Sequence, residues 1–244
     1  MKINAGKLTE YLNATIENHN NHAQEPPYMM GLVHEMDEIF HKEIFAHDYD
    51  ANTATMLLAM NSYMMLSNAI HQSLSGHMVA VFPVVRTALE SACYAYLTSS
   101  DEKMEAIWFN RGKSKTATGR CRDAFTIGAA TAKLKQASPD MADYVKKLYD
   151  STIEYGAHPN IKSISHHLQD KGLINDAFRV FTHVGVYGEN SRNVNSALLL
   201  CVETGHAIAF LLSLSAKGHP FVNSRLDVFE EWIDKTHKMA DELG

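Results

Sequence analysis

The sequence of 244 residues has few cysteines, and none of them stands in a recognised motif. Cys93, Cys121 and Cys201 are odd in number, and the first and last lie within apolar segments, the usual setting of a reduced, buried thiol. The segment after Met1 lacks the apolar stretch of a signal peptide. These two absences predict a protein of a reducing compartment, and we expect it to be cytoplasmic.

The signature motifs of several large enzyme classes are also missing. The chain contains no Gly-x-Gly-x-x-Gly, no Gly-x-Ser-x-Gly and no His-Glu-x-x-His. Gly112-Lys113-Ser114 matches the end of a phosphate-binding P-loop, but Ile107 stands where that motif requires its first glycine. Dehydrogenase, kinase and hydrolase functions therefore have no support in the sequence.

No strong excess of charge marks the chain for a nucleic acid or a membrane surface. Its formal net charge is −6 and 20% of its residues are charged, as in ordinary globular proteins. Its most apolar stretches, 78–98 and 197–214, each hold a pair of titratable residues: Arg86 with Glu90, and Glu203 with His206. Membrane-spanning helices rarely carry such pairs. We therefore interpret both stretches as core helices and expect no membrane partner.

Apolar residues recur at helical spacing along most of the chain. The pattern predicts helices over residues 5–20, 28–46, 51–75, 77–98, 101–111, 114–136, 139–156 and 193–215, with a final helix after Ser224. Near Gly76 the chain either reverses into a hairpin or continues as one long helix kinked at Pro83. Strands are predicted only over 161–168 and 177–187, with a turn at Asp170-Lys171-Gly172. We expect a mainly all-α, single-domain fold, residues 1–244: a multi-helix bundle with at most one small β-hairpin near 161–187.

Arg86 and Glu90 are the only charged residues in the stretch 78–98, and their spacing of four places both on one helix face. Burying either charge alone would cost several kcal/mol, so the two should pair or meet other polar groups. The pair is then either an internal salt bridge that fixes helix packing, or part of a polar pocket in which Arg86 binds an anion. The second interpretation predicts a ligand-binding set within one internal network: Arg86, Glu90, Tyr155, His158, Glu203 and His206.

Two short motifs resemble those of a known group of proteins. Residues 82–90, Phe-Pro-Val-Val-Arg-Thr-Ala-Leu-Glu, and the Gly-Ala-His-Pro that begins at Gly156 are similar to motifs of bacterial helical-bundle proteins loosely related to the HEPN-like superfamily. The resemblance covers roughly residues 55–215. It implies an all-α bundle that is often a homodimer, and its better-known relatives are ribonucleases of toxin and defence systems.

Those ribonucleases carry an Arg followed, after four to six residues, by a His on the same helix. In this chain the residues at those distances from Arg86 are Ser91, Ala92 and Cys93. His183 follows Arg179 one residue too early. A HEPN-type ribonuclease or nucleotide-acting enzyme is therefore an alternative hypothesis, and it requires Arg86 and His158 to meet in space.

A third hypothesis is a metal-binding helical bundle. Glu203-x-x-His206 and Glu38-x-x-His41 match the ligand pattern of di-iron bundles, in which both side chains project into the core. Glu38 and His41 nevertheless lie opposite the apolar stripe of their predicted helix. Three further histidines would bind a metal only if the hairpin brought them together: His166, His167 and His183. We expect no metal and no other cofactor.

One local run of basic residues has no acidic residue within it: Arg111, Lys113, Lys115, Arg120 and Arg122. Such a run is typical of a solvated helix face, and it is also the pattern of a phosphate or RNA contact. Our leading hypothesis for the whole chain is a helical bundle that binds an anionic small ligand or partner through the Arg/Glu/His pocket.

Overall fold

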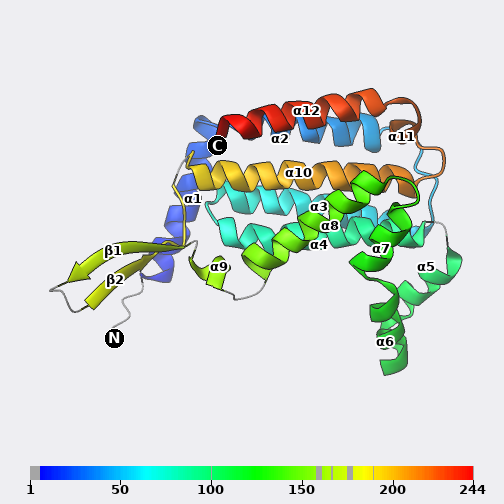
Figure 1. Ribbon diagram of the computed structural model, residues 1–244, viewed down its shortest axis with the longest axis horizontal. Coiled ribbons are helices and arrows are strands. Elements are labelled where there is room, and N and C mark those ends of the chain that lie inside the picture. Colours follow the sequence, from blue (N-terminus) through cyan, green and yellow to red (C-terminus); the bar gives the residue numbers. More distant parts are fainter. Residues whose placement is uncertain are drawn as a thin grey trace.

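The computed structural model describes residues 6–99, 101–157, 161–165, 167–174, 178–188 and 190–243. These residues fold as a bundle of helices with one two-stranded antiparallel hairpin at one end (Figure 1), which confirms the predicted mainly all-α fold. The elements in chain order are α1 (Leu8–Gln24), α2 (Met30–Ile39), η1 (Phe40–Ile44), α3 (Thr53–Leu74), α4 (Met78–Thr98), α5 (Glu102–Phe109), η2 (Arg111–Lys113), α6 (Lys115–Ala124), α7 (Ile127–Leu134), α8 (Pro139–Thr152), η3 (Ile153–Ala157), α9 (Ile161–Ser165), β1 (Leu168–Ile174), β2 (Phe178–His183), α10 (Arg192–Ser215), α11 (Pro220–Ser224) and α12 (Leu226–Leu243).

Helices α3 and α4 form a hairpin rather than one long kinked helix. The chain reverses at Gly76, whose φ of 84° is open to glycine but disfavoured for other residues. The carbonyl of Gly76 accepts a hydrogen bond from Tyr187 N at 3.0 Å, which fixes the turn. Further along, Ser62 Oγ donates to Ala88 O at 2.8 Å and ties the two helices together. Pro83 lies inside α4.

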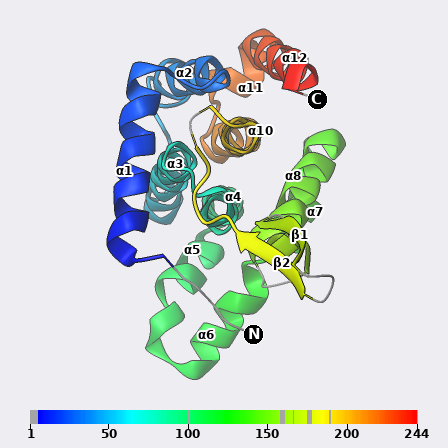
Figure 2. The same ribbon diagram turned by 90° about the vertical axis from the view of Figure 1, so that its left-hand side faces the viewer.

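Helix α10 runs through the middle of the bundle, between the α3–α4 hairpin and the helices α2 and α12 (Figure 2). Most of its residues are buried, because apolar side chains surround it on all sides. Among the described helices, α4 and α10 are long and apolar enough to cross a membrane, and 44% and 78% of their most apolar windows are buried inside the fold. The core helix of a soluble protein passes the same test, so this finding is weak evidence for a membrane span.

Helix α8 packs against α4, α7 and α10 and continues into the short π-helix η3. It begins where the sequence predicts. Ser138 caps it by accepting a hydrogen bond from Met141 N at 3.3 Å, and Pro139 occupies the first turn, where it needs no backbone donor. The predicted helix 139–156 therefore forms as α8 with η3, and its end lies against α4.

Two predicted helices have wrong boundaries. The single helix expected over 114–136 is two helices, α6 and α7. Thr126 between them is extended, with φ −127° and ψ 153°, and its Oγ1 accepts a hydrogen bond from Ala129 N at 3.0 Å. This local capping bond starts a new helix in place of a continuation. The helix expected over 5–20 extends to Gln24.

The hairpin also differs from its prediction. The segment predicted as the first strand, 161–168, contains the helix α9, and β1 begins only at its end. Asp170-Lys171-Gly172, predicted as a turn, lies inside β1, where the register with β2 shifts between Asp170 and Leu173. Gly172 has a φ of 85°, and its N–H donates to Asp170 Oδ1 at 2.9 Å. The turn-forming residues therefore make a bulge within the strand.

Candidate functional site

Arg86 stands on α4 and binds two partners. Its Nε donates to Glu90 Oε1 at 2.9 Å, and its Nη2 donates to the hydroxyl of Tyr149 on α8 at 2.8 Å. The guanidinium carbon lies 4.9 Å from the centre of the Tyr149 ring, within cation–π range. Glu90 is the partner that the spacing of four predicts. Tyr149 is absent from the predicted ligand-binding set, because only the packing of α8 on α4 brings it here.

The Arg86 cluster is open to solvent. The side chains of Arg86 and Glu90 each keep 26% of their accessible surface. Partial burial lowers the pKa of Arg86, but the carboxylate of Glu90 and the oxygen of Tyr149 raise it further, so its pKa stays above the ordinary value. Burial raises the pKa of the Tyr149 phenol. The cluster is therefore a lasting ion pair beside a neutral phenol, within reach of water.

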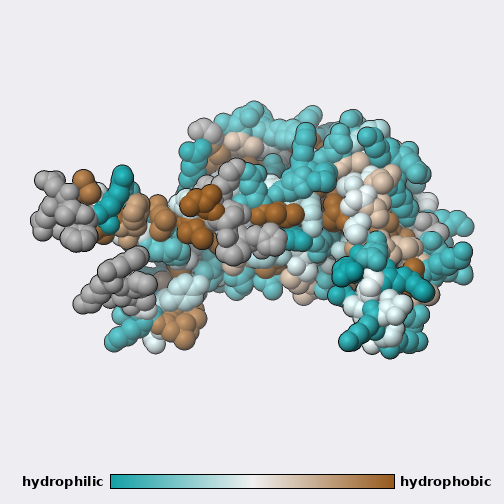
Figure 3. All heavy atoms as spheres, turned by 60° about the horizontal axis from the view of Figure 1, so that its bottom comes forward, coloured by the Kyte–Doolittle hydropathy of each residue, from teal (hydrophilic) through white to brown (hydrophobic). Residues whose placement is uncertain are grey.

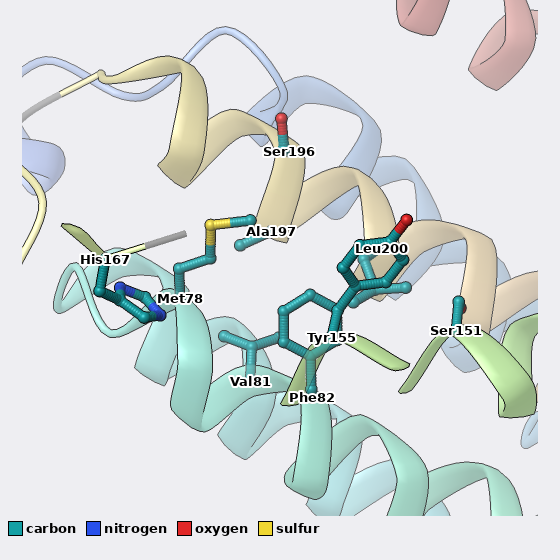
Figure 4. Close-up of a pocket in the computed structure, with 9 residues that line it drawn as sticks. All are labelled: Met78, Val81, Phe82, Ser151, Tyr155, His167, Ser196, Ala197 and Leu200. Carbon is teal, nitrogen blue, oxygen red and sulfur yellow. The ribbon is translucent and has the colours of Figure 1, made fainter. Parts of the chain in front are cut away.

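A cavity of about 380 Å³ lies between α4, η3 and α10 (Figure 4). Its apolar walls are Met78, Val81, Phe82, Ala197 and Leu200. Its polar side chains are Ser151, Tyr155, His167 and Ser196. Tyr155 and Phe82 lie side by side, with ring centres 6.1 Å apart, and His167 lies near Met78 (Figure 4). The cavity thus has an apolar interior with a few polar groups from different elements.

The π-helix η3 shapes one wall of this cavity. Gly156 in η3 packs directly against Phe82, and a Cβ at Gly156 would lie 2.7 Å from two atoms of the Phe82 ring. A glycine is therefore required for η3 to approach α4 this closely. π-Helical turns are frequent at functional sites, because they redirect side chains that a regular helix would place elsewhere. Here η3 carries Tyr155, which lines the cavity.

The Arg86 cluster adjoins this cavity without lining it. Phe82 on the cavity wall stands one helical turn before Arg86 on α4, and Ser151 stands two residues after Tyr149 on the other side. Of the predicted ligand-binding residues, Tyr155 lines the cavity. Arg86 lies one turn and Glu90 two turns beyond Phe82 on α4, and His158 falls outside the described residues.

His167 lines the cavity, although the sequence suggested it only as a metal ligand. It is buried, and its Nδ1 lies 3.2 Å from the hydroxyl of Tyr187. Its ring centre is 5.6 Å from that of His183, so the hairpin does bring these two histidines together. His166 falls outside the described residues. No spacing in the sequence identifies His167 as a cavity residue, because the cavity walls are far apart along the chain.

Glu203 and His206 belong to a second, buried cluster. The Nε2 of His206 lies 3.2 Å from Thr236 Oγ1 on α12, and its Nδ1 lies 3.4 Å from the hydroxyl of Tyr144 on α8. Tyr144 also donates to the carbonyl oxygen of Glu203 at 3.1 Å. Burial lowers the pKa of His206 to about 3 and raises the pKa of the Glu203 carboxyl. The imidazole is therefore neutral near pH 7.

The single network expected from the sequence is two separate clusters. Tyr149 belongs to the Arg86 cluster and Tyr144 to the His206 cluster, and within the described part of the chain no hydrogen bond or ion pair joins them. Residues five apart on a helix point about 140° away from each other. Tyr149 and Tyr144 on α8 therefore contact different residues, Arg86 and His206.

Neither the metal hypothesis nor the nuclease hypothesis gains support from the described residues. No three His, Cys, Asp or Glu side chains among them could hold a metal ion together. Glu38 pairs with Lys42 on the exposed face of its helix, far from a shared core site. Arg179 pairs with Asp170 across the hairpin. The nuclease hypothesis needs His158, which lies outside the described residues.

The basic run lies on an arm of α5, η2 and α6 that projects from the bundle (Figures 1 and 3). All of its members are exposed: Arg111, Lys113, Lys115, Arg120 and Arg122. Arg120 also lines a second cavity of about 360 Å³ with Lys103 and Asn110. Arg122 approaches Asp123 at 3.4 Å. Such exposure fits both a solvated face and a phosphate contact.

Comparison with known proteins identifies no relative of this chain. No family model matches the chain, and no curated protein or solved structure matches it. The resemblance of the motifs around Arg86 and Gly156 therefore stays a prediction.

Proposed function

We propose that this protein binds a small ligand, with an apolar body and an anionic end, in the cavity between α4, η3 and α10. The observation that carries the proposal is the cavity itself, which joins an apolar interior to polar groups from α8, η3, α10 and the segment before β1. Small-molecule sites are typically hollows of about 300–1,000 Å³ with apolar walls and a few placed polar groups. The volume of about 380 Å³ lies within this range.

A packing defect is the competing explanation. Protein interiors hold few voids much larger than a water molecule, and the surrounding side chains lose contacts wherever a void persists. This hollow is large, and one of its walls is a π-helix that packs closely against α4 because Gly156 has no Cβ to meet Phe82. A local geometry of this kind supports a binding site more than a gap left by imperfect packing.

Arg86 supports an anionic end for the ligand. It stands one turn beyond the cavity wall and keeps a quarter of its surface exposed. Glu90 and Tyr149 use two of its five N–H donors. The other donors suit a carboxylate, sulfonate or phosphate, which a guanidinium binds well. A ligand whose apolar part fills the cavity would bring such a group towards Arg86.

Two fluorescent probes test the proposal. We expect 1-anilinonaphthalene-8-sulfonate, an anion, and N-phenyl-1-naphthylamine, its neutral counterpart, both to bind the cavity. Ser196→Leu should reduce binding of both by at least about 10-fold, because the larger side chain fills the hollow. Arg86→Gln should weaken only the sulfonate, by about 3- to 10-fold, since the neutral probe makes no ion pair.

The matched control is Ala117→Leu, which introduces the same leucine side chain at the wall of the second cavity on the arm. It should leave the binding of both probes unchanged. Binding that survives Ser196→Leu would place the probes elsewhere on the molecule and contradict the proposal. An equal loss of both probes in Arg86→Gln would contradict the anionic end.

A further inference from the structure

The arm formed by α5, η2 and α6 is the basic part of an acidic chain. It projects from the body of the bundle (Figure 1). Residues 102–124 hold six basic and three acidic side chains, a net charge of +3, whereas the whole chain carries −6. The rest of the chain therefore carries −9. This separation of charge makes the arm attract anionic groups that the body repels.

Most basic side chains of the arm have no acidic partner. Of the six, only Arg122 forms an ion pair in the part of the chain that the structure describes, at 3.4 Å from Asp123. Glu105 is engaged elsewhere, because its carboxylate accepts a hydrogen bond from Ala54 N at 3.1 Å, in the first turn of α3. The cations that face solvent without an ion pair are Lys103, Arg111, Lys113, Lys115 and Arg120.

The second cavity, of about 360 Å³, is an open groove between the two helices of the arm, and we name it the arm groove. No acidic side chain lines it among the described residues. Its walls combine aliphatic side chains with two cations and one amide, and its lining residues are Lys103, Ala106, Ile107, Asn110, Ala117 and Arg120.

The groove lies where two neighbouring helices normally close against each other. Its residues on α5, at 103, 106, 107 and 110, share one helix face, and so do those on α6, at 117 and 120. Such faces usually interdigitate. Here α5 has no fully buried residue, and α6 has only Cys121. The aliphatic surface is left open, so covering it with an apolar group is favourable.

We infer that the arm groove binds a short acidic segment of another protein. An aliphatic side chain of that segment lies against Ile107 and the alanines, and carboxylates on either side of it pair with Lys103 and Arg120. The amide of Asn110 can donate to or accept from the main chain of the segment. A single exposed ion pair contributes little to binding, so the partner needs several carboxylates, and a small monoanion is held weakly here.

A nucleic acid is a less suitable occupant. Proteins that bind single strands stack the bases on aromatic side chains. The lining of the arm groove has no aromatic residue, and the exposed Phe109 lies outside it. A long polyanion also extends over the acidic body, which repels it, whereas a short segment stays beside the arm. Aliphatic walls between two cations therefore favour an acidic peptide.

Three fluorescein-labelled peptides test the inference. The first, Glu-Glu-Leu-Leu-Glu-Glu, has carboxylates around an aliphatic centre. The second has Gln in place of every Glu, and the third has Ser in place of both Leu. By fluorescence anisotropy in about 50 mM NaCl, the first peptide should bind at least about 10-fold more tightly than either of the others. Raising the NaCl to about 500 mM should weaken it by about 10-fold, because salt screens exposed ion pairs.

Matched variants of the protein locate the site. Arg120→Gln should weaken the first peptide by about 5- to 10-fold, whereas Arg122→Gln, two residues further along α6 and outside the groove, should change it by less than about 2-fold. Ala117→Leu fills the groove and should weaken the peptide by at least about 10-fold, while Ser196→Leu, in the other cavity, should not. Arg120 is exposed, so Arg120→Gln should keep the wild-type melting temperature.

Several outcomes would overturn the inference. One is no binding of the first peptide up to about 1 mM. Another is equal binding of the peptide with Ser in place of Leu, because a solvated basic face attracts any anion. Equal losses in Arg120→Gln and Arg122→Gln would place the peptide outside the groove. Hexauridylate RNA, with a similar negative charge, should bind at least about 10-fold more weakly than the first peptide. Tighter binding of the RNA would overturn the inference in favour of a nucleic acid.

Discussion

The two polar clusters on the apolar helices α4 and α10 differ in what surrounds them. Arg86 and Glu90 lie at a partly exposed seam between α4 and α8, where water and the Tyr149 phenol stabilise the ion pair. His206 lies against the rings of Trp232 and Phe229, with centres 4.2 and 6.2 Å away, and is neutral because these surroundings do not stabilise a cation.

The comparison shows that a titratable residue in an apolar helix takes a different role at a partly exposed seam than in the buried core. A charge at a seam beside a cavity keeps donors that a ligand can reach. A titratable group in the core instead contributes to packing, and its neutral form is part of the stability of the fold. We therefore expect changes at His206 to alter stability, and changes around Arg86 to alter binding.

The largest expected effect is on stability at the core cluster. His206→Leu removes the ring that lies between the hydroxyls of Tyr144 and Thr236 and leaves both without this partner. We expect the free energy of unfolding in urea to fall by about 2–3 kcal/mol. His34→Leu, at an exposed position, is the control and should change it by less than about 0.5 kcal/mol. Equal effects of the two variants would contradict the comparison.

The pH dependence of stability should report on the same residue. Because the pKa of His206 is lowered to about 3, the unfolded chain binds a proton below its ordinary pKa of about 6.5 and the folded chain does not. Stability should therefore fall as the pH falls from about 6.5, by up to about 1.4 kcal/mol per pH unit from this group. Burial of Glu203 acts in the opposite direction, since it raises the pKa of that carboxyl, so the folded chain takes up this proton before the unfolded chain does as the pH falls.

Comparing the wild type with His206→Leu isolates this contribution. Urea unfolding at pH 7.0, 6.0 and 5.0, in both proteins, should show a shallower loss of stability in the variant, with a difference of about 1–2 kcal/mol by pH 5. Parallel curves for the two proteins would show that other histidines, such as His77 or His219, cause the acid dependence.

The smallest expected effect on stability is at the seam. Glu90→Gln keeps an oxygen to accept from Arg86 Nε but removes the negative charge, so stability should fall by less than about 1 kcal/mol. Affinity for 1-anilinonaphthalene-8-sulfonate should instead rise by about 3- to 10-fold, because the charge of Arg86 is no longer neutralised. Fluorescence titration measures it.

Glu38→Gln is the matched control, because Glu38 forms the same kind of ion pair with Lys42 at an exposed position of the fold. It should leave probe affinity unchanged. If Glu90→Gln weakened binding of the sulfonate, or if both variants raised it equally, the seam around Arg86 would not be the anion site.

Much of the local structure follows from the sequence. The apolar runs of α4 and α10 and the cap at Ser138 with Pro139 depend on residues within a few positions of each other. The pairing of Arg86 with Glu90 is of the same kind, because a spacing of four fixes both on one helix face.

The reversal at Gly76 was one of two alternatives that the sequence allowed, and the hydrogen bond from Tyr187 N belongs to the tertiary structure. At Thr126 a short-range capping bond, rather than the apolar pattern, sets the helix boundary. At Asp170-Lys171-Gly172 the turn-forming residues make a bulge and do not end the strand, because β1 continues to pair with β2 beyond them.

Only the tertiary structure decided the rest. Tyr149 meets Arg86 from a position 63 residues away, and the cavity takes its walls from segments as distant as Met78 and Leu200. Tertiary contacts also determine which side of α1 is buried. Asn18 on the buried side donates a hydrogen bond to Tyr187 O, while the apolar residues Leu12 and Ile16 stay exposed. Periodicity specifies which residues share a face, but it does not specify what that face meets. That depends on packing between distant segments, which no local spacing encodes.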